Sequence, residues 1–172
     1  MDDTFELKDT IDYKRLNDLG DANDEILIGY PTGMMHINDD ADSETTDMAE
    51  DARKLYFGAE DIPARPFLTD GMMNGQPEIQ QAIEKHMKKL VDTGKGLLKR
   101  VATVCVASVQ DFVREGGYKD SIPNSQATID AKSTRANGEY LLSDIPLIDS
   151  AQMINSLTSV INGELSSVKE GA

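Results

Sequence analysis

The stretch from Pro77 to Glu115 constrains the fold of this chain more than any other, because its apolar residues recur every three or four positions throughout. Such spacing predicts an amphipathic helix, which at about 1.5 Å per residue would be about 58 Å long. Gly116–Gly117 is a typical helix end, and the Gly94–Gly96 segment is the point where such a helix would bend or break. The predicted length exceeds what a chain of 172 residues needs across its own core. We therefore expect part of the helix to pack on neighbouring molecules.

Shorter patterns around this stretch predict strands and one further helix. Glu25 to Pro31 has the composition of a buried strand, and Met34 to Ile37 is its expected partner across a short turn. A helix is expected from Ser43, acting as its cap, to Leu55. Leu157 to Ile161 is strand-like and runs into a turn at Asn162–Gly163. These elements predict an α+β fold with one long central helix packed on a small mixed β-sheet. The side chains expected to be among the most buried are Ile83, Leu90, Leu98, Val101, Cys105 and Phe112.

Composition divides the chain into three parts. Residues 1–24 carry eight carboxylates without clear periodicity, which predicts an acidic N-terminal arm. Residues 25–165 are long enough for a single α+β domain, and residues 166–172 form a C-terminal tail. Within the domain, residues 118–144 are polar and predict a long loop. Loops of that length are usually functional or disordered, and both alternatives stay open here.

The segment from Ile62 to Leu68 stands out although it carries no catalytic pattern. Pro63 and Pro66 fix their own backbone and push the residues before them into extended geometry. Arg65 offers a planar guanidinium that can bind a carboxylate or backbone carbonyls. Phe67–Leu68 supplies an apolar anchor. We therefore expect a stiff, extended strut, and an ordinary strand entry with a surface arginine is the alternative.

A second segment, from Pro146 to Ser156, lies on the other side of the helical stretch. Asp149 is placed to cap a short helix, since its side-chain oxygen can accept the free N–H groups of the next turn. Leu147 and Ile148 before it are apolar.

Taken in this order, the two segments resemble the neck or tail-completion proteins of tailed phages, also described as virion-morphogenesis or minor tail components. The family pattern is a turn with glycine, a proline-alanine-arginine-proline-phenylalanine-leucine run, a long helix, and a proline-leucine-isoleucine-aspartate-threonine-glycine run before a final strand. Pro63 to Leu68 matches the first run in full, with Phe57–Gly58 before it. Pro146 to Asp149 matches the second run, but Ser150–Ala151 replaces threonine and glycine. The resemblance covers roughly Asp47 to Gly163.

The resemblance implies a structural virion protein that forms a ring at the head–tail junction, connects the head connector to the tail and lets DNA pass without specific binding. It implies a homo-oligomer, with a hexamer as first choice and a dodecamer as second, next to neck, connector and tail-tube proteins. The expected location is the virion, after assembly in the host bacterial cytoplasm. A tail terminator that caps the tail tube is the nearest alternative, and a small α+β enzyme or regulatory protein is the alternative of another class. The residues expected at a subunit or ring interface are Pro63, Arg65, Pro66, Phe67, Leu68, Ile148 and Asp149.

Charge is distributed unevenly along the chain. Residues 1–80 hold 20 acidic and 6 basic residues, whereas residues 81–172 hold 11 of each, so the net charge of −14 lies in the first half. A surface this acidic repels phosphate backbones and argues against ordinary nucleic-acid binding. We expect no measurable affinity for DNA.

The sequence offers little catalytic or metal-binding chemistry, and we expect no enzyme, no cofactor and no metal. The Asp40–Glu44 segment begins like a calcium loop but lacks its glycine and its closing glutamate. His36 and His86 have no partner at ligand spacing. Cys105, the only cysteine, is expected to be a small core residue. No apolar run is long enough to span a membrane, and the acidic amino terminus is unlike a secretory signal.

Overall fold

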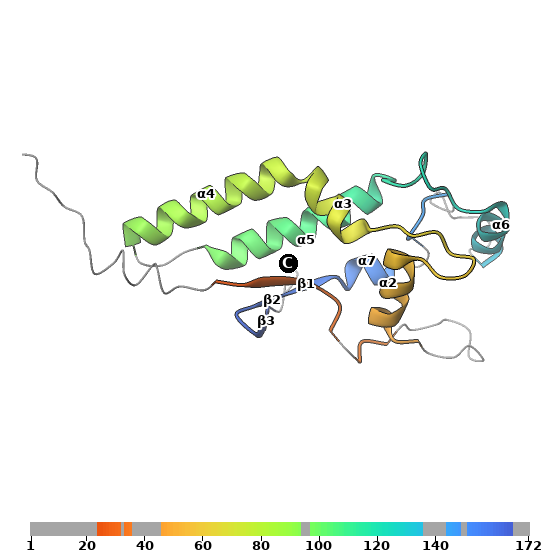
Figure 1. Ribbon diagram of the computed structural model, residues 1–172, viewed down its shortest axis with the longest axis horizontal. Helices are drawn as coiled ribbons and strands as arrows, with labels where there is room; N and C mark the ends of the chain where they lie inside the picture. Colours follow the sequence, from red (N-terminus) through yellow and green to blue (C-terminus); the bar gives the residue numbers. More distant parts are fainter. Residues whose placement is uncertain are drawn as a thin grey trace, which may run out of the picture.

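The computed structural model describes residues 24–31, 33–35, 46–93, 97–135, 144–148 and 151–166. Within these ranges the chain forms six helices and one three-stranded sheet, an α+β fold (Figure 1). Several expectations lie outside the described residues, namely residues 1–23 of the acidic arm, Ile37, the Ser43 cap, Gly94–Gly96, Asp149 and the tail from residue 167.

The expected single long helix is two helices. α4 runs from Gln76 to Thr93 and α5 from Leu98 to Arg114, and the two pack side by side (Figure 1). The connection is fixed by His86, whose Nδ1 accepts a hydrogen bond of 2.8 Å from the Leu97 N–H. Folding the stretch back on itself buries apolar residues of one helix against the other, which a single 58 Å helix could not do within one chain.

The sheet is antiparallel rather than mixed, and its strand order is β1-β2-β3. β1 (Ile26–Gly29) pairs with β2 (Thr158–Ile161), and β2 continues through the Asn162–Gly163 turn into β3 (Glu164–Ser166). Asn162 and Gly163 have φ values of 50° and 81°, as a tight hairpin turn requires. Met34 and Met35, the described part of the expected partner, do not pair with β1, which pairs with a strand from the far end of the chain. Met35 instead forms an isolated bridge with Asp47.

Two short helices precede the α4–α5 pair. α2 (Met48–Phe57) begins later than expected because Asp47 is its cap and accepts the Ala49 N–H at 2.9 Å. It ends at Gly58, whose φ of 82° favours glycine. α3 (Phe67–Asn74) packs so closely on α5 that a Cβ added at Gly71 would lie 2.7 Å from the Val109 Cα.

The remaining helices lie in the carboxy-terminal half. α6 (Gln126–Arg135) occupies part of the region expected to be a loop, so that expectation is wrong for these residues. α7 (Gln152–Asn155) leads into β2 and is tied to α5, where Gln110 Nε2 donates to the Ile154 carbonyl at 3.0 Å.

The main core lies between α2, α3, α5 and α7, and a smaller apolar cluster lies between α4 and α5. Of the side chains expected to be most buried, Val101 and Cys105 are buried. Leu90, Leu98 and Phe112 are half-buried. The expectation for Ile83 is wrong, because this side chain is 45% exposed.

Candidate functional site

Arg65 ties two connecting segments together and is only 5% exposed. Its Nε donates to the Ile122 carbonyl at 3.1 Å, and its Nη2 donates to the Pro123 carbonyl at 3.0 Å. The backbone N–H of Arg65 donates to the Leu55 carbonyl of α2. Burial lowers the pKa of the guanidinium, which stays protonated at any physiological pH. Arg65 thus fixes the α2–α3 connection against the chain that enters α6.

The proline segment is extended only as far as Pro66. Phe67 and Leu68 were expected to belong to the strut, but they form the first turn of α3. The Phe67 side chain is fully buried in the main core, in the same apolar cluster as Ile148. The two sequence segments that stand far apart in the chain are therefore in one core.

The segment after residue 143 is held by a buried lysine that the sequence did not single out. Lys132 of α6 is 8% exposed and donates from Nζ to the Ile145 carbonyl at 3.1 Å and to the Ile148 carbonyl. Its ammonium group donates hydrogen bonds to carbonyls that lie outside the strands and helices and therefore have no regular backbone partner. No periodicity marks Lys132 in the sequence, because the α6 pattern is only weakly amphipathic.

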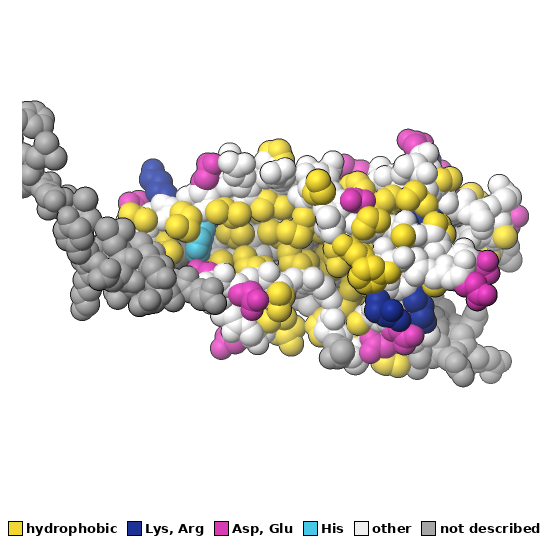
Figure 2. All heavy atoms as spheres, in the orientation of Figure 1, with side chains coloured by type: hydrophobic (Ala, Val, Ile, Leu, Met, Phe, Trp, Pro, Cys, Tyr) yellow, Lys and Arg dark blue, Asp and Glu magenta, His cyan; other side chains and the backbone are white. Residues whose placement is uncertain are grey.

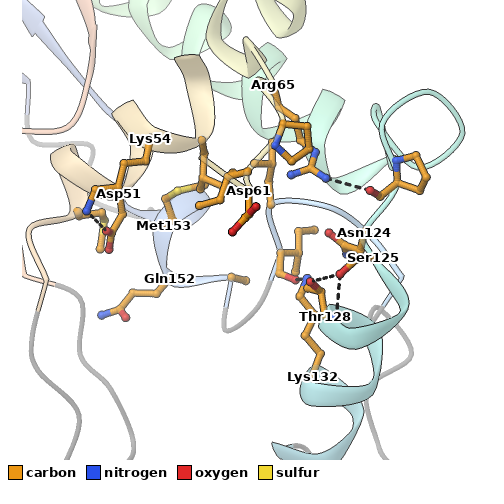
Figure 3. Close-up of a pocket in the computed structure, with 18 residues that line it drawn as sticks. Asp51, Lys54, Asp61, Arg65, Asn124, Ser125, Thr128, Lys132, Gln152 and Met153 are labelled. Carbon is orange, nitrogen blue, oxygen red and sulfur yellow. Dashed lines mark hydrogen bonds and ion pairs between the residues drawn. The ribbon is translucent and has the colours of Figure 1, made fainter. Parts of the chain in front are cut away.

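A pocket of about 680 Å³ lies where these segments meet (Figure 3). Four parts of the chain form its wall: α2, residues 61–65, residues 123–132, and residues 147–148 with 151–153. In Figure 3, Lys54 and Asp51 lie together at the left, Asp61 lies near the centre, and Arg65 and Lys132 lie at the upper right and below. Its volume lies within the range of about 300–1,000 Å³ that is typical of binding pockets.

The pocket combines an apolar wall with polar side chains. Its polar side chains already have partners in several cases: Lys54 pairs with Glu50 at 3.1 Å, and the Ser125 and Thr128 hydroxyls lie 2.9 Å apart. None of its lining side chains is a histidine or a cysteine, so the described lining holds no Ser–His or Cys–His pair. Apolar groups such as Ile62, Pro63 and Leu147 make up much of the wall. An apolar group could therefore bind in the pocket, between the charged side chains of Arg65 and Lys132.

A second polar contact lies in the core beside Arg65. The Tyr118 hydroxyl donates to Asp70 Oδ2 at 2.5 Å, and Tyr118 is 5% exposed. Burial, and then the Asp70 carboxylate, raise the pKa of the Tyr118 phenol well above its usual value. The phenol therefore stays protonated and acts as a donor that joins α3 to the segment after α5.

The structure brings most of the expected interface residues together, but most of their side chains are buried or half-buried. Pro63 is exposed and lines the pocket with Arg65 and Ile148. Pro66 and Leu68 are half-buried, whereas Arg65, Phe67 and Ile148 are buried within the single chain. Asp149 lies outside the described residues. The parts of this set that a neighbouring subunit could reach are therefore Pro63, the accessible sides of Pro66 and Leu68, and the pocket itself.

Neither the comparisons with known proteins nor the grouping of the described side chains identifies a function. No family model, no curated protein and no solved structure matches this chain. Within the described residues, no three or more His, Cys, Asp or Glu side chains are grouped so that they could hold a metal ion. Among the helices of these same residues, none combines the length and apolar character needed to cross a membrane.

Proposed function

We propose that this protein is a structural subunit of the head–tail junction of a tailed phage, a neck or tail-completion protein without catalytic activity. In this role it forms a ring, favoured as a hexamer with a dodecamer as second choice, between the head connector and the tail. Its place is the virion, after assembly in the host bacterial cytoplasm. DNA passes through the ring without binding to it.

One observation carries the proposal: the two segments that resemble the family meet at one place in the fold. Phe67 and Ile148 share the main core, and Arg65 and Ile148 line one pocket. A resemblance produced by chance in two separate short segments gives no reason for them to be neighbours in space. Exposed apolar side chains on several elements, including Phe57 at 71% and Met73 at 67%, also suit a protein that packs against others.

The direct test is a phage in which the gene for this protein carries an early stop codon. We expect separate filled heads and finished tails by electron microscopy, and joined particles when the protein is supplied from a plasmid. Purified wild-type virions should contain the chain by mass spectrometry. Normal infectious particles from the stop-codon phage would contradict the proposal.

The same experiment separates the two alternatives. A tail terminator would leave tails of irregular length, because the end of the growing tube would not be capped. The pocket gives the enzyme or regulatory alternative one specific observation in its favour, since a cavity of about 680 Å³ could hold a small molecule. A metabolite that raises the melting temperature of the wild type, but not of an Ile62→Glu variant, would support that alternative.

A further inference from the structure

The outer face of α4 carries an apolar stripe that is not used in the described core. Ile83, Met87 and Val91 are 45%, 48% and 51% exposed, while Ala82 and His86 on the same helix are buried. A helix turns about 100° per residue, so three residues spaced by four lie on a face about 80° wide and about 12 Å long. Figure 2 shows hydrophobic side chains gathered along α4 and α5 on the face in view. Met87 is the centre of this α4 stripe.

Two opposite charges border the α4 stripe on its solvent side. By the helical repeat, Glu84 lies about 60° around the helix from Met87, and Lys88 lies about 100° from it in the same direction. Both side chains are exposed. Along the helix axis, Glu84 lies about 4.5 Å before Met87 and Lys88 about 1.5 Å after it.

We propose that the α4 stripe is a two-fold contact between two copies of this chain, with the α4 helices packed antiparallel and Met87 at the symmetry axis. In this arrangement Met87 meets Met87 of the partner copy, and Ile83 meets the partner copy's Val91. Lys88 then stands about 3 Å along the axis from Glu84 of the partner copy, on the same flank. The symmetry repeats this pair, so the contact is complementary in charge as well as apolar.

The charge order on α4 decides between this contact and its parallel counterpart. In a parallel side-by-side pair related by a two-fold axis along the helices, the flank with Glu84 and Lys88 of one copy lies opposite the other flank of its partner, so Lys88 and Glu84 of different copies do not meet. Only the antiparallel contact brings these opposite charges together. The contact goes beyond the proposed function, since it would join two copies, or two rings, in any particle that contains them.

Cysteine cross-linking tests the geometry. Cys105 is buried, so a cysteine placed at Met87 would be the accessible thiol of the full-length chain. A residue on the two-fold axis meets its own copy, and closely packed helices bring the two Cα atoms within the roughly 4.4–6.8 Å of a disulfide. We expect Met87→Cys to form a covalent dimer under mild oxidation at least about tenfold faster than Lys85→Cys, which lies about 160° around the same helix. Equal rates for the two variants would overturn the proposal.

Charge substitutions test the pairing without a cysteine. Lys88→Glu and Glu84→Lys should each raise the dimer dissociation constant at least about tenfold, equivalent to about 1.4 kcal/mol. The double variant Glu84→Lys/Lys88→Glu should return it to within about threefold of wild type. Leu165→Glu, at a 63% exposed position of β3, is the matched control and should have no effect. Circular dichroism and melting temperature check that each variant is folded.

Sedimentation equilibrium over a range of protein concentrations measures the dimer dissociation constant of each variant. Dimers that weaken in both single variants and recover in the double variant support the contact. A wild type that remains monomeric at millimolar concentration, or an oligomer that none of the α4 substitutions changes, overturns it. Either of these results leaves the proposed function intact, because that function is judged by the stop-codon phage.

Discussion

At the scale of single residues, the 146–151 segment contains two side chains at backbone positions that favour glycine. Leu147 has φ of 65° and Ala151 has φ of 58°. A left-handed conformation costs an L-residue with a Cβ about 1–2 kcal/mol, a strain that glycine does not have. Ala151 is also the position at which the phage family pattern has glycine.

We therefore expect Ala151→Gly to raise the free energy of unfolding by about 0.5–1 kcal/mol, since relief of strain exceeds the extra entropy of an unfolded glycine. Urea denaturation measures the change. Ala127→Gly in α6 is the control, because its site is helical and exposed; it should lower stability by about 0.5–1 kcal/mol. Loss of stability in both variants would show that Ala151 is not strained.

Two buried tyrosines should respond in opposite ways to loss of their hydroxyls. Tyr118 donates to Asp70, so Tyr118→Phe should lower the free energy of unfolding by about 1.5–3 kcal/mol, the range for hydrogen bonds to charged groups. The buried Tyr30 hydroxyl has no hydrogen-bond partner among the described residues, so Tyr30→Phe should leave stability unchanged or raise it by about 1 kcal/mol. Thermal unfolding at pH 7 separates the two cases.

The raised pKa values of these two tyrosines predict that the fold loses stability as the pH rises above about 10. The pKa of each phenol is raised in the fold by burial, so the folded state favours the protonated form. Their contribution is complete below the unfolded pKa of about 10 and is lost as pH rises above it. Tyr118→Phe should make the fall in melting temperature between pH 9 and pH 11 less steep. An unchanged slope in this variant would contradict the assignment.

At the scale of elements, Arg65 holds the α2–α3 connection against the segment before α6. Its removal leaves the Ile122 and Pro123 carbonyls without their donors, and a buried polar group without a partner costs about 1–3 kcal/mol. If Arg65 acted only at a subunit interface, Arg65→Ala would leave the fold largely intact and weaken assembly. The buried contacts indicate that the fold also depends on Arg65.

We expect Arg65→Ala to lower the free energy of unfolding by about 2–4 kcal/mol, and Arg65→Lys to recover only part of it, because lysine cannot reproduce the two-pronged contact. The control is Arg53→Ala, an exposed position on α2, with an expected change below about 0.5 kcal/mol. Amide exchange of Ile122, Asn124 and Ser125 should rise in the Arg65 variants alone. Equal stability of Arg65→Ala and wild type would show that these carbonyls do not need the guanidinium.

At the scale of the whole molecule, net charge controls association. Each chain carries −14, so copies repel one another over the whole surface while apolar groups on α4 and elsewhere favour contact. At an ionic strength of 0.1 M, salt largely screens the repulsion between charges more than about 10 Å apart. It leaves apolar contacts in place. We therefore expect mostly monomer at low ionic strength and more oligomer as sodium chloride is raised.

Light scattering after size-exclusion chromatography measures this effect, and a fluorescently labelled DNA duplex in the same buffers tests for DNA binding. The expected result is no binding at any salt concentration. Tight DNA binding that weakens steeply with salt would require a cationic face and would contradict this account.

The sequence by itself determined the α+β class, the strands around residues 26–29 and 158–161, the turn at Asn162–Gly163 and the burial of Cys105 and Val101. These follow from local rules: the helical repeat, turn residues with positive φ, and the preference of apolar side chains for the core. The sequence also indicated that Arg65 would bind either a carboxylate or backbone carbonyls, since a planar guanidinium can donate to both, and the structure shows that backbone carbonyls are its partners.

Only the tertiary structure decided the remaining features. The periodicity of residues 77–115 is the same for one long helix and for two helices folded together, and the packing of α4 on α5 is what selects the second. The partner of β1 comes from the far end of the chain, which no local pattern specifies. The pocket likewise depends on four segments that meet through Arg65 and Lys132, whose partners are backbone carbonyls that no side-chain pattern specifies. Local preferences act over a few residues, whereas burial and the pairing of backbone groups depend on which distant segments become neighbours.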